Sequence, residues 1–146
     1  MRIRPVAAAD RSAWETLWRG YLAFYDTELP ARVYDNTFSR LLSDDPADPC
    51  GLVAEIDGNL QGLVHFLFHA HCWKPEGICY LQDLFTSPGA RGGGIGRALI
   101  EAVYDAADAR GVPAVYWLTQ DFNAPARALY DRIGVCTPFV KYNRPV

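Results

Sequence analysis

A glycine-rich segment carries the clearest chemical signal in this chain. It reads Arg91-Gly92-Gly93-Gly94-Ile95-Gly96-Arg97, directly after a strand-like run from Cys79 to Thr86 and at the start of an amphipathic helix. Glycine lets a ligand approach the backbone closely, and the first N–H groups of a helix have no intrahelical acceptors. These donors, the positive end of the helix dipole and the two arginines all favour a bound anion. The segment therefore predicts a pyrophosphate site.

Two familiar glycine-rich motifs do not fit this segment. A dinucleotide fingerprint needs glycine at its first, third and sixth positions, but the sixth position is Arg97 when counting starts at Gly92, and Leu99 when it starts at Gly94. A Walker A loop must end in Gly-Lys-Ser or Gly-Lys-Thr, whereas this chain continues with Gly96, Arg97 and Ala98. The alternative that remains is a flexible turn between a strand and a helix.

Two ordered motifs resemble the GNAT superfamily of N-acetyltransferases. Arg91-x-x-Gly94-x-Gly96, preceded by Leu81-Gln82-Asp83-Leu84-Phe85-Thr86, is similar to the coenzyme A signature of that family. Asn123-x-x-Ala126-x-x-Leu129-Tyr130-x-x-Ile133-Gly134 resembles its next conserved helix, at the expected distance downstream. Within the superfamily, these segments are similar to the diamine, polyamine and histone acetyltransferase branch.

The resemblance implies an enzyme that binds acetyl-CoA and transfers the acetyl group directly to a primary amine of a small molecule, either a polyamine or an amino-acid-like compound. A protein lysine is the nearer alternative acceptor. A different class of function is a coenzyme A binding or sensor domain without turnover, and a third is a purely structural interaction domain. Homodimers are common in the family, and the aromatic helix face and the C-terminal strand are candidate dimer contacts.

The same resemblance assigns the residues that contact the cofactor. The strand end Leu84-Phe85-Thr86 would pair with the pantetheine arm as an added strand does, with an N–H near Phe85 as the oxyanion donor. Tyr130 matches the tyrosine acid of the family, although its helical position also suits a core tyrosine. The expected cofactor-binding set is Leu84, Phe85, Thr86, Arg91, Gly92, Gly93, Gly94, Ile95, Gly96, Arg97, Asn123 and Tyr130.

The amine acceptor must lose a proton, because a free alkylamine has a pKa near ~10.4. The polyamine branch often has glutamate where this chain has Gln82, and glutamine cannot act as a base. Asp83 follows, on the opposite face by strand alternation, and is a candidate base or a structural hydrogen-bonding residue. Tyr25 and Trp73 come from regions that form the acceptor side in the family. Together with Gln82 and Asp83, they are the expected substrate-binding residues.

Three histidines raise the question of a metal. His65, His69 and His71 have the same strand parity, and Cys72 follows them. Acyl transfer needs no metal, so we expect a sheet-face or groove role instead. One of these histidines could replace the missing glutamate through a water, because neutral imidazole accepts protons near pH 7.

Composition indicates one domain over residues 1–146, which is long enough to bury its own core. Cys50, Cys72, Cys79 and Cys136 form no CxxC pair, and the first residues form no apolar signal stretch. The longest apolar run is far shorter than the ~20 residues of a membrane span. A net charge of −3 and a pI near 5.5 provide no broad basic surface. We therefore expect a cytoplasmic protein that binds neither nucleic acid nor membrane.

The apolar pattern predicts an α/β (α+β) domain, a mixed and mostly antiparallel sheet flanked by helices. Expected strands cover Met1–Val6, Leu52–Ile56, Leu60–Phe68, Ile78–Thr86, Ala114–Thr119 and Thr137–Tyr142. Expected helices cover Arg32–Leu42 and Gly96–Arg110, and two others follow the N-caps Asp10 and Asn123. Asp57-Gly58-Asn59 predicts a hairpin turn, and Lys74 to Gly77 a loop. The aromatic helix face predicted to lie in the core consists of Trp14, Leu17, Trp18, Tyr21 and Tyr25.

Overall fold

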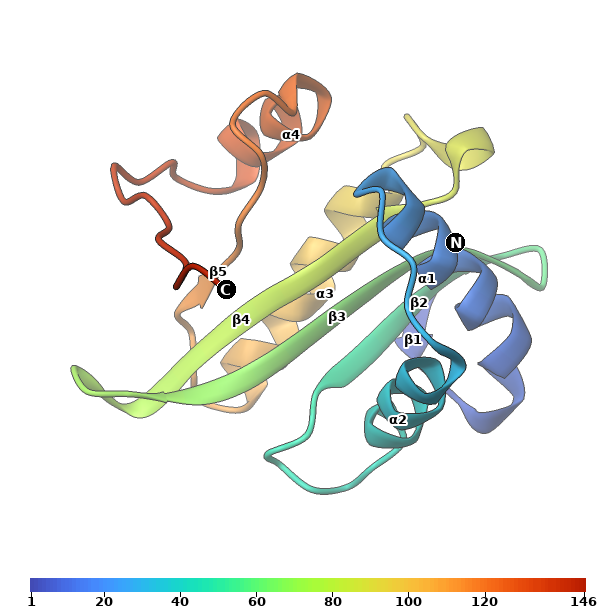
Figure 1. The fold of residues 1–146 in the computed structure, drawn as a ribbon, viewed down its shortest axis with the longest axis horizontal. Coiled ribbons are helices and arrows are strands. Elements are labelled where there is room, and N and C mark those ends of the chain that lie inside the picture. Colours follow the sequence, from blue (N-terminus) through green and yellow to red (C-terminus); the bar gives the residue numbers. More distant parts are fainter.

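A five-stranded mixed sheet in the order β1-β2-β3-β4-β5 is the centre of the computed structural model, which describes residues 1–146 (Figure 1). The first four strands pair antiparallel with their neighbours, and β5 runs parallel to β4, which confirms the expected fold class. The strands are β1 Arg2–Pro5, β2 Cys50–Ile56, β3 Asn59–His71, β4 Lys74–Thr86 and β5 Val115–Tyr116.

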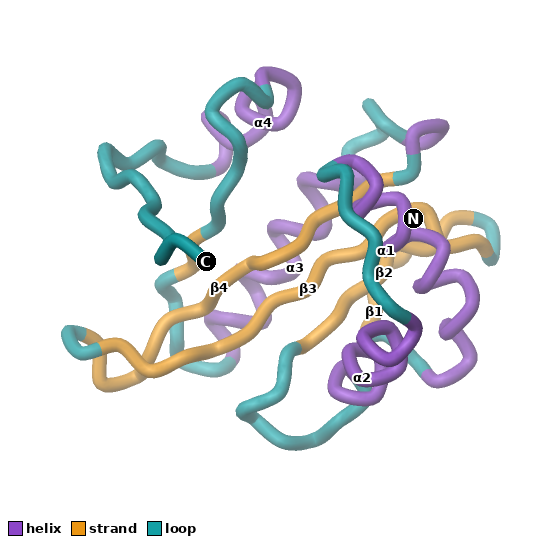
Figure 2. The backbone as a smooth tube through the Cα atoms, in the orientation of Figure 1, coloured by secondary structure: helices purple, strands orange, loops and turns teal.

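Helices cover both faces of this sheet, as Figure 2 shows. Helices α1 and α2 pack on one face, α3 packs on the other, and α4 lies beside the end of β4 where β5 leaves the sheet. Their bounds are α1 Arg11–Phe24, α2 Ala31–Leu41, α3 Ile95–Ala109 and α4 Ala124–Ile133, with single 3₁₀ turns at Ala8–Asp10 and Pro88–Ala90. No helix is both long and apolar enough to cross a membrane.

The two faces of the sheet carry separate hydrophobic cores. Successive strand residues point to opposite faces, so Val53 and Leu63 pack beneath α1 and α2, while Ala54 and Val64 pack beneath α3. All four are fully buried. The central strands β2 and β3 are therefore held from both sides, which fixes the position of their neighbour β4.

The hairpins explain where the strands begin and end. Asp57 and Gly58 both have positive φ, at 49° and 79°, as a two-residue hairpin turn requires, and the predicted β2–β3 hairpin is confirmed. The predicted loop from Lys74 to Gly77 was wrong, because β3 and β4 extend to a register in which His71 pairs with Lys74. An irregularity between His69 and His71 accommodates Pro75 at this end.

The C-terminal part departs most from the expected elements. The strand predicted over Ala114–Thr119 shrinks to Val115–Tyr116, and the strand predicted over Thr137–Tyr142 does not form. Only Cys79 and Tyr80 of β4 pair with β5, and residues 137–142 pair with no strand, although the outer edge of β5 is free. The large apolar side chains of this last segment are exposed: Val135, Phe139, Val140, Tyr142 and Val146.

Both predicted N-caps use their side chains elsewhere. Asp10 makes no capping hydrogen bond to α1, because its carboxylate accepts from the Arg4 guanidinium at 2.7 and 2.9 Å and from the Ala7 N–H at 2.8 Å. This pair ties β1 to the start of α1. Asn123 likewise does not cap α4, and its amide donates to Thr119 Oγ1 at 3.4 Å.

Candidate active site

The sheet opens at the C-terminal half of β4. Only Cys79 and Tyr80 of β4 pair with β5, and the chain then diverges, so the outer edge of β4 from Leu81 to Thr86 has no neighbouring strand. Backbone donors and acceptors along such an edge can pair with an extended ligand.

A cavity of about 500 Å³ lies in this opening. Its wall combines the end of α1, the end of β4, the glycine-rich loop with the start of α3, and α4. The predicted residues that line it are Tyr25, Leu84, Phe85, Thr86, Arg91, Gly92, Gly94, Ile95, Gly96, Arg97, Asn123 and Tyr130. The lining residues outside the expected binding sets are Tyr21, Phe24, Ala90, Pro125, Ala126, Leu129 and Arg132.

The glycine-rich loop forms an anion cradle at one end of the cavity. Gly92 and Gly94 have φ of 83° and 80°, and a Cβ at either position would meet no protein atom within 4 Å. The backbone N–H groups from Gly92 to Arg97 have no acceptor within the protein. Six unpaired donors at the N-terminus of α3 fit the pyrophosphate of coenzyme A. Gly93, which was predicted to bind the cofactor, does not line the cavity itself.

The two arginines of the motif hold different positions. Arg91 donates from Nε to the Thr86 carbonyl at 3.3 Å and lies over the Phe85 ring at 5.9 Å from its centroid, which places its charge beside the cavity. Arg97 lines the cavity but pairs with Glu101 at 2.7 Å. Arg91 is therefore the better placed of the two to supply positive charge to a phosphate.

Tyr130 projects from α4 into the other part of the cavity. Burial raises the pKa of Tyr130 to about 12, and the nearby Tyr25 phenol contributes to this shift. The ring of Trp117 packs edge-on against Tyr130 at 5.5 Å and fixes its orientation. Burial, followed by the charge of Asp83, raises the pKa of Tyr25 as well. Both phenols therefore carry their protons at neutral pH and can donate them.

Helix α1 lies close to β4 because Gly20 faces it. A Cβ at Gly20 would lie 2.9 Å from the Phe85 ring, so a larger residue would push the helix away from the strand. This contact brings the residues of one α1 face over Asp83. Trp18 donates from its indole nitrogen to Asp83 Oδ2 at 3.1 Å.

Asp83 belongs to a buried hydrogen-bonded network beneath the cavity wall. It is 7% exposed, and its Oδ2 also contacts His65 Nδ1 at 2.8 Å. His65 Nε2 faces the indole N–H of Trp14 at 2.9 Å. Indole nitrogen is only a donor, so Nε2 must accept and the proton of His65 must be on Nδ1, donated to Asp83. Both ring nitrogens of His65 are therefore engaged in hydrogen bonds.

A β-bulge aims Asp83 toward α1. His65 pairs with Asp83 and Phe66 pairs with Leu81, which leaves Gln82 as an extra residue on β4. Leu81 consequently packs beneath α3 while Asp83 faces α1, although residues two apart normally share a face. The alternation of side chains is therefore interrupted between Leu81 and Asp83. Gln82 is exposed and does not line the cavity.

Several predicted residues lie away from the cavity. Trp73 is 88% exposed at the β3–β4 turn, far from the acceptor role expected of it. His69 binds the Tyr116 hydroxyl through Nε2 at 2.8 Å, and no group of three His, Cys, Asp or Glu residues could hold a metal. The expectation that a histidine replaces the missing glutamate is not supported for His65, because both of its nitrogens are already bonded.

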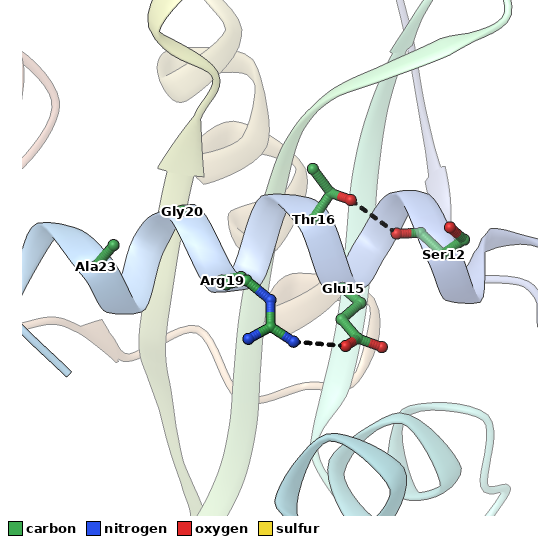
Figure 3. Close-up of a pocket in the computed structure, with 6 residues that line it drawn as sticks. All are labelled: Ser12, Glu15, Thr16, Arg19, Gly20 and Ala23. Atoms are coloured by element: carbon green, nitrogen blue, oxygen red, sulfur yellow. Dashed lines mark hydrogen bonds and ion pairs between the residues drawn. The ribbon is translucent and has the colours of Figure 1, made fainter. Parts of the chain in front are cut away.

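A second hollow of similar volume lies on the outer face of α1 (Figure 3). Its most polar residue, Glu15, is paired with Arg19 at 2.7 Å and with Arg11 at 3.1 Å. Thr16 donates to the Ser12 carbonyl at 3.1 Å. The charges in this hollow are already compensated, so the cavity at the end of β4 is the candidate active site.

Sequence reasoning missed the polar ends of the aromatic face on α1. Trp14, Leu17 and Trp18 are buried, as predicted. Tyr25, which was also predicted to bind the substrate, lines the cavity, and so does Tyr21, which was predicted only for the core. A signal was present, because buried indole and phenol groups need hydrogen-bond partners.

Comparison with known proteins agrees with this geometry. The Acetyltransferase (GNAT) family model matches residues 11–135. The D-amino-acid N-acetyltransferase HPA3 of Saccharomyces cerevisiae is 37% identical over 145 residues, which cover 97% of this chain and 89% of that protein. The uncharacterized N-acetyltransferase YhfO of Bacillus subtilis is 28% identical and matches 97% of this chain and 95% of its own. The aminoglycoside acetyltransferase AAC(6')-Iy, solved with a coenzyme A bisubstrate analogue, shares the fold with a TM-score of 0.83 at 17% identity, covering 99% and 97% of the two chains.

Proposed function

The chain belongs to the acetyltransferase (GNAT) family and is an acetyl-CoA-dependent N-acetyltransferase, and we propose that it acetylates the primary amine of a small, amino-acid-like molecule. One observation supports the proposal above all. A single cavity joins an anion cradle at the start of α3 to a cluster of phenols backed by the buried Asp83. The first feature suits the cofactor and the second suits a reacting amine.

The charge of the cavity favours an amino-acid-like acceptor over a polyamine. Of the nineteen lining residues, three are arginines and none is a carboxylate. A polycation would gain no ion pair from these side chains, whereas an acceptor that carries a carboxylate suits the third arginine, Arg132. The similarity to a protein named D-amino-acid N-acetyltransferase supports the same acceptor class. The finer resemblance to the polyamine and histone branch stays a prediction.

Bound acetyl-CoA supplies the activated thioester, and the residues of the chain position it. The N–H groups from Gly92 to Arg97 and the Arg91 guanidinium would hold the pyrophosphate. The free edge of β4 at Leu84 to Thr86 would hold the pantetheine arm, and an N–H near Phe85 would stabilise the developing oxyanion. Asn123 lines the wall beside the same arm.

Proton transfers are assigned to two residues, one buried behind the cavity wall and one that lines the cavity. Asp83 is proposed as the base that takes the proton of the amine, and Tyr130 as the acid that protonates the departing thiolate. Tyr130 retains its proton at neutral pH because burial raises its pKa. Gln82 is exposed and Trp73 lies at the far turn, so neither belongs to the proposed acceptor site.

We also propose a homodimer in which the C-terminal segment contacts a second copy of the chain. Phe139 and Tyr142 are 87% and 91% exposed, and the outer edge of β5 has no strand neighbour. Exposed apolar residues of this size and an open sheet edge are typical of interaction surfaces. Light scattering on the chain and on the double variant Phe139→Ser, Tyr142→Ser tests this, with a dimer expected to become a monomer. A wild-type monomer would exclude it.

The acceptor class is tested by an acceptor panel at saturating acetyl-CoA. Thiol release would be followed with L- and D-amino acids, polyamines and lysine-containing peptides, and compared as kcat/KM. We expect kcat/KM to be higher for amino acids than for polyamines. A higher kcat/KM for polyamines or for peptides would show that the proposed acceptor class is wrong. Acetyl-CoA binding without thiol release for any amine would favour a sensor domain.

A further inference from the structure

Two stacked tyrosines form an aromatic platform on the sheet where β5 leaves β4. Tyr80 and Tyr116 are the last residues that pair between these strands, and their rings stack with centroids 4.8 Å apart and an interplanar angle of 12°. Both side chains are half-buried, and neither belongs to the hydrophobic core on either face of the sheet. Core packing therefore does not account for this pair.

His69 fixes one ring of the aromatic platform. Its Nε2 lies 2.8 Å from the Tyr116 hydroxyl, and its Nδ1 lies 2.9 Å from the Ala70 carbonyl oxygen. A carbonyl oxygen only accepts, so in the neutral ring Nδ1 has the proton and Nε2 accepts from the Tyr116 hydroxyl. Because His69 is on β3 and Tyr116 is on β5, this bond crosses β4 and holds the Tyr116 ring against Tyr80.

The β-bulge in β4 places Tyr80 beside Asp83. Tyr80 pairs with Leu67 and Asp83 pairs with His65, so the two β4 residues lie opposite β3 residues that are two positions apart. Two positions along a strand correspond to about 7 Å and to the same face. Tyr80 therefore shares a face with Asp83, although residues three apart on a regular strand face opposite sides.

The face of the Tyr80 ring toward Asp83 is not covered by Tyr116. The Tyr116 ring reaches toward His69, which pairs with Ile78 and is therefore further from Asp83 than Tyr80 is. The sheet is also open here, because β3 and β4 continue past α1 and α2 toward their hairpin (Figure 1). A side chain that lies along the sheet beside Asp83 can therefore contact the Tyr80 ring.

We propose that the aromatic platform binds the side chain of the acceptor and makes the enzyme prefer aromatic amino acids. This inference rests on the proposed function, in which the amine gives its proton to Asp83. The distance of about 7 Å between Asp83 and Tyr80 along the strand is the length of one amino-acid side chain. Aromatic rings that stack or pack edge-on gain free energy beyond the area they bury. Tyr80 contacts the acceptor, and Tyr116 and His69 position Tyr80.

The test compares kcat/KM for phenylalanine with kcat/KM for alanine, both as the enantiomer that the enzyme accepts, at saturating acetyl-CoA. We expect a ratio of about 10 for the wild-type enzyme. The ratio should fall several-fold in Tyr80→Val, since valine suits a strand but has no ring. Tyr80→Phe keeps the ring and should keep the ratio. Loss of folded protein would lower both kcat/KM values together and leave their ratio unchanged.

Two further variants make the result independent of one substitution. Tyr116→Phe keeps the stacked ring but loses the bond to His69, so we expect a smaller fall in the ratio, about 2-fold. Trp73→Ala removes an exposed ring at the β3–β4 turn and should leave the ratio unchanged. If Tyr80→Val does not fold, the wild-type ratio and Tyr116→Phe decide the question.

Three outcomes would overturn the proposal. A wild-type ratio near 1, or an equal ratio in Tyr80→Val, would refute the aromatic platform and leave the acetylation of amino acids standing. A ratio near 1 that rises in the double variant Phe139→Ser, Tyr142→Ser would show that the exposed C-terminal segment covers the platform instead. A wild-type enzyme that releases no thiol with any amino acid would refute the proposed function and the platform with it.

Discussion

His65 Nδ1 lies 2.8 Å from Asp83 Oδ2, although the two residues are on different strands and neither faces bulk solvent. The contact exists because β4 has an extra residue at Gln82, which turns Asp83 to the face that carries α1. Because Trp14 donates to the other imidazole nitrogen, this contact is a neutral histidine donating to a carboxylate. The tautomer of His65 is therefore a direct test of the network.

The first prediction concerns this tautomer. Nitrogen-15 spectra of the imidazole at neutral pH should show His65 protonated on Nδ1, with Nε2 as the acceptor of a hydrogen bond. Trp14→Phe removes the N–H that binds Nε2 and should shift only that nitrogen strongly. His69, whose Nε2 faces the Tyr116 hydroxyl, provides an internal reference. A spectrum with the proton on Nε2 of His65 would show that the network is arranged differently.

The second prediction concerns Tyr130→Phe, which removes only a hydroxyl. We expect kcat to fall about 10²-fold or more, with acetyl-CoA affinity nearly unchanged, because the phenol acts on the departing thiolate. The raised pKa of about 12 keeps Tyr130 protonated below that value, so the ratio of wild-type to variant kcat should stay constant from pH 7 to pH 9. Unchanged turnover would remove Tyr130 from the acid role.

The third prediction tests the anion cradle through Gly94→Val. The φ of Gly94 is 80°, a left-handed conformation that a branched residue adopts only with strain, and the new side chain would project into the open cradle. Acetyl-CoA binding should be lost in calorimetry. Gly89→Val is the matched control, because Gly89 is outside the cavity, has no positive φ and has open space around its Cα. Equal affinity of both variants would mean that the phosphates bind elsewhere.

The fourth prediction concerns stability and its dependence on pH. The Arg4 guanidinium holds the pKa of Asp10 below its ordinary value, so the contribution of this carboxylate is complete above about pH 4 and is lost as the pH falls through the lower, folded-state pKa. Asp10→Asn should reduce the free energy of unfolding by about 1–3 kcal/mol at pH 7. Urea unfolding at pH 7 and at pH 3 should show this difference shrinking in acid. A difference that grows in acid would contradict the assigned ion pair.

Much of the fold was predictable because local patterns determine it. The turn at Asp57 and Gly58 defines its own hairpin, and the glycine-rich loop marks the start of α3. Strand ends depend on partners instead. Lys74 to Gly77 became strand because β3 extends beside it, whereas residues 137–142 stayed irregular because they pair with no strand.

The candidate site likewise has one part that local sequence patterns predict and another that depends on tertiary packing. The cradle residues follow one another along the chain, so a motif finds them. Trp18 and His65 are 47 positions apart and come together at Asp83 only through the packing of α1 and the bulge in β4. A register shift of this kind has no residue signature in the sequence, so strict alternation could not show that Leu81 and Asp83 face opposite sides of the sheet.

The most direct test of the account is a time course of thiol release from acetyl-CoA with a D- or L-amino acid, with the product identified by mass spectrometry. We expect the wild-type protein to form one N-acetylated amino acid for each thiol released, and the Gly94→Val variant to form neither product. Thiol release without an acetylated amine, or tight acetyl-CoA binding with no release for any acceptor, would contradict it.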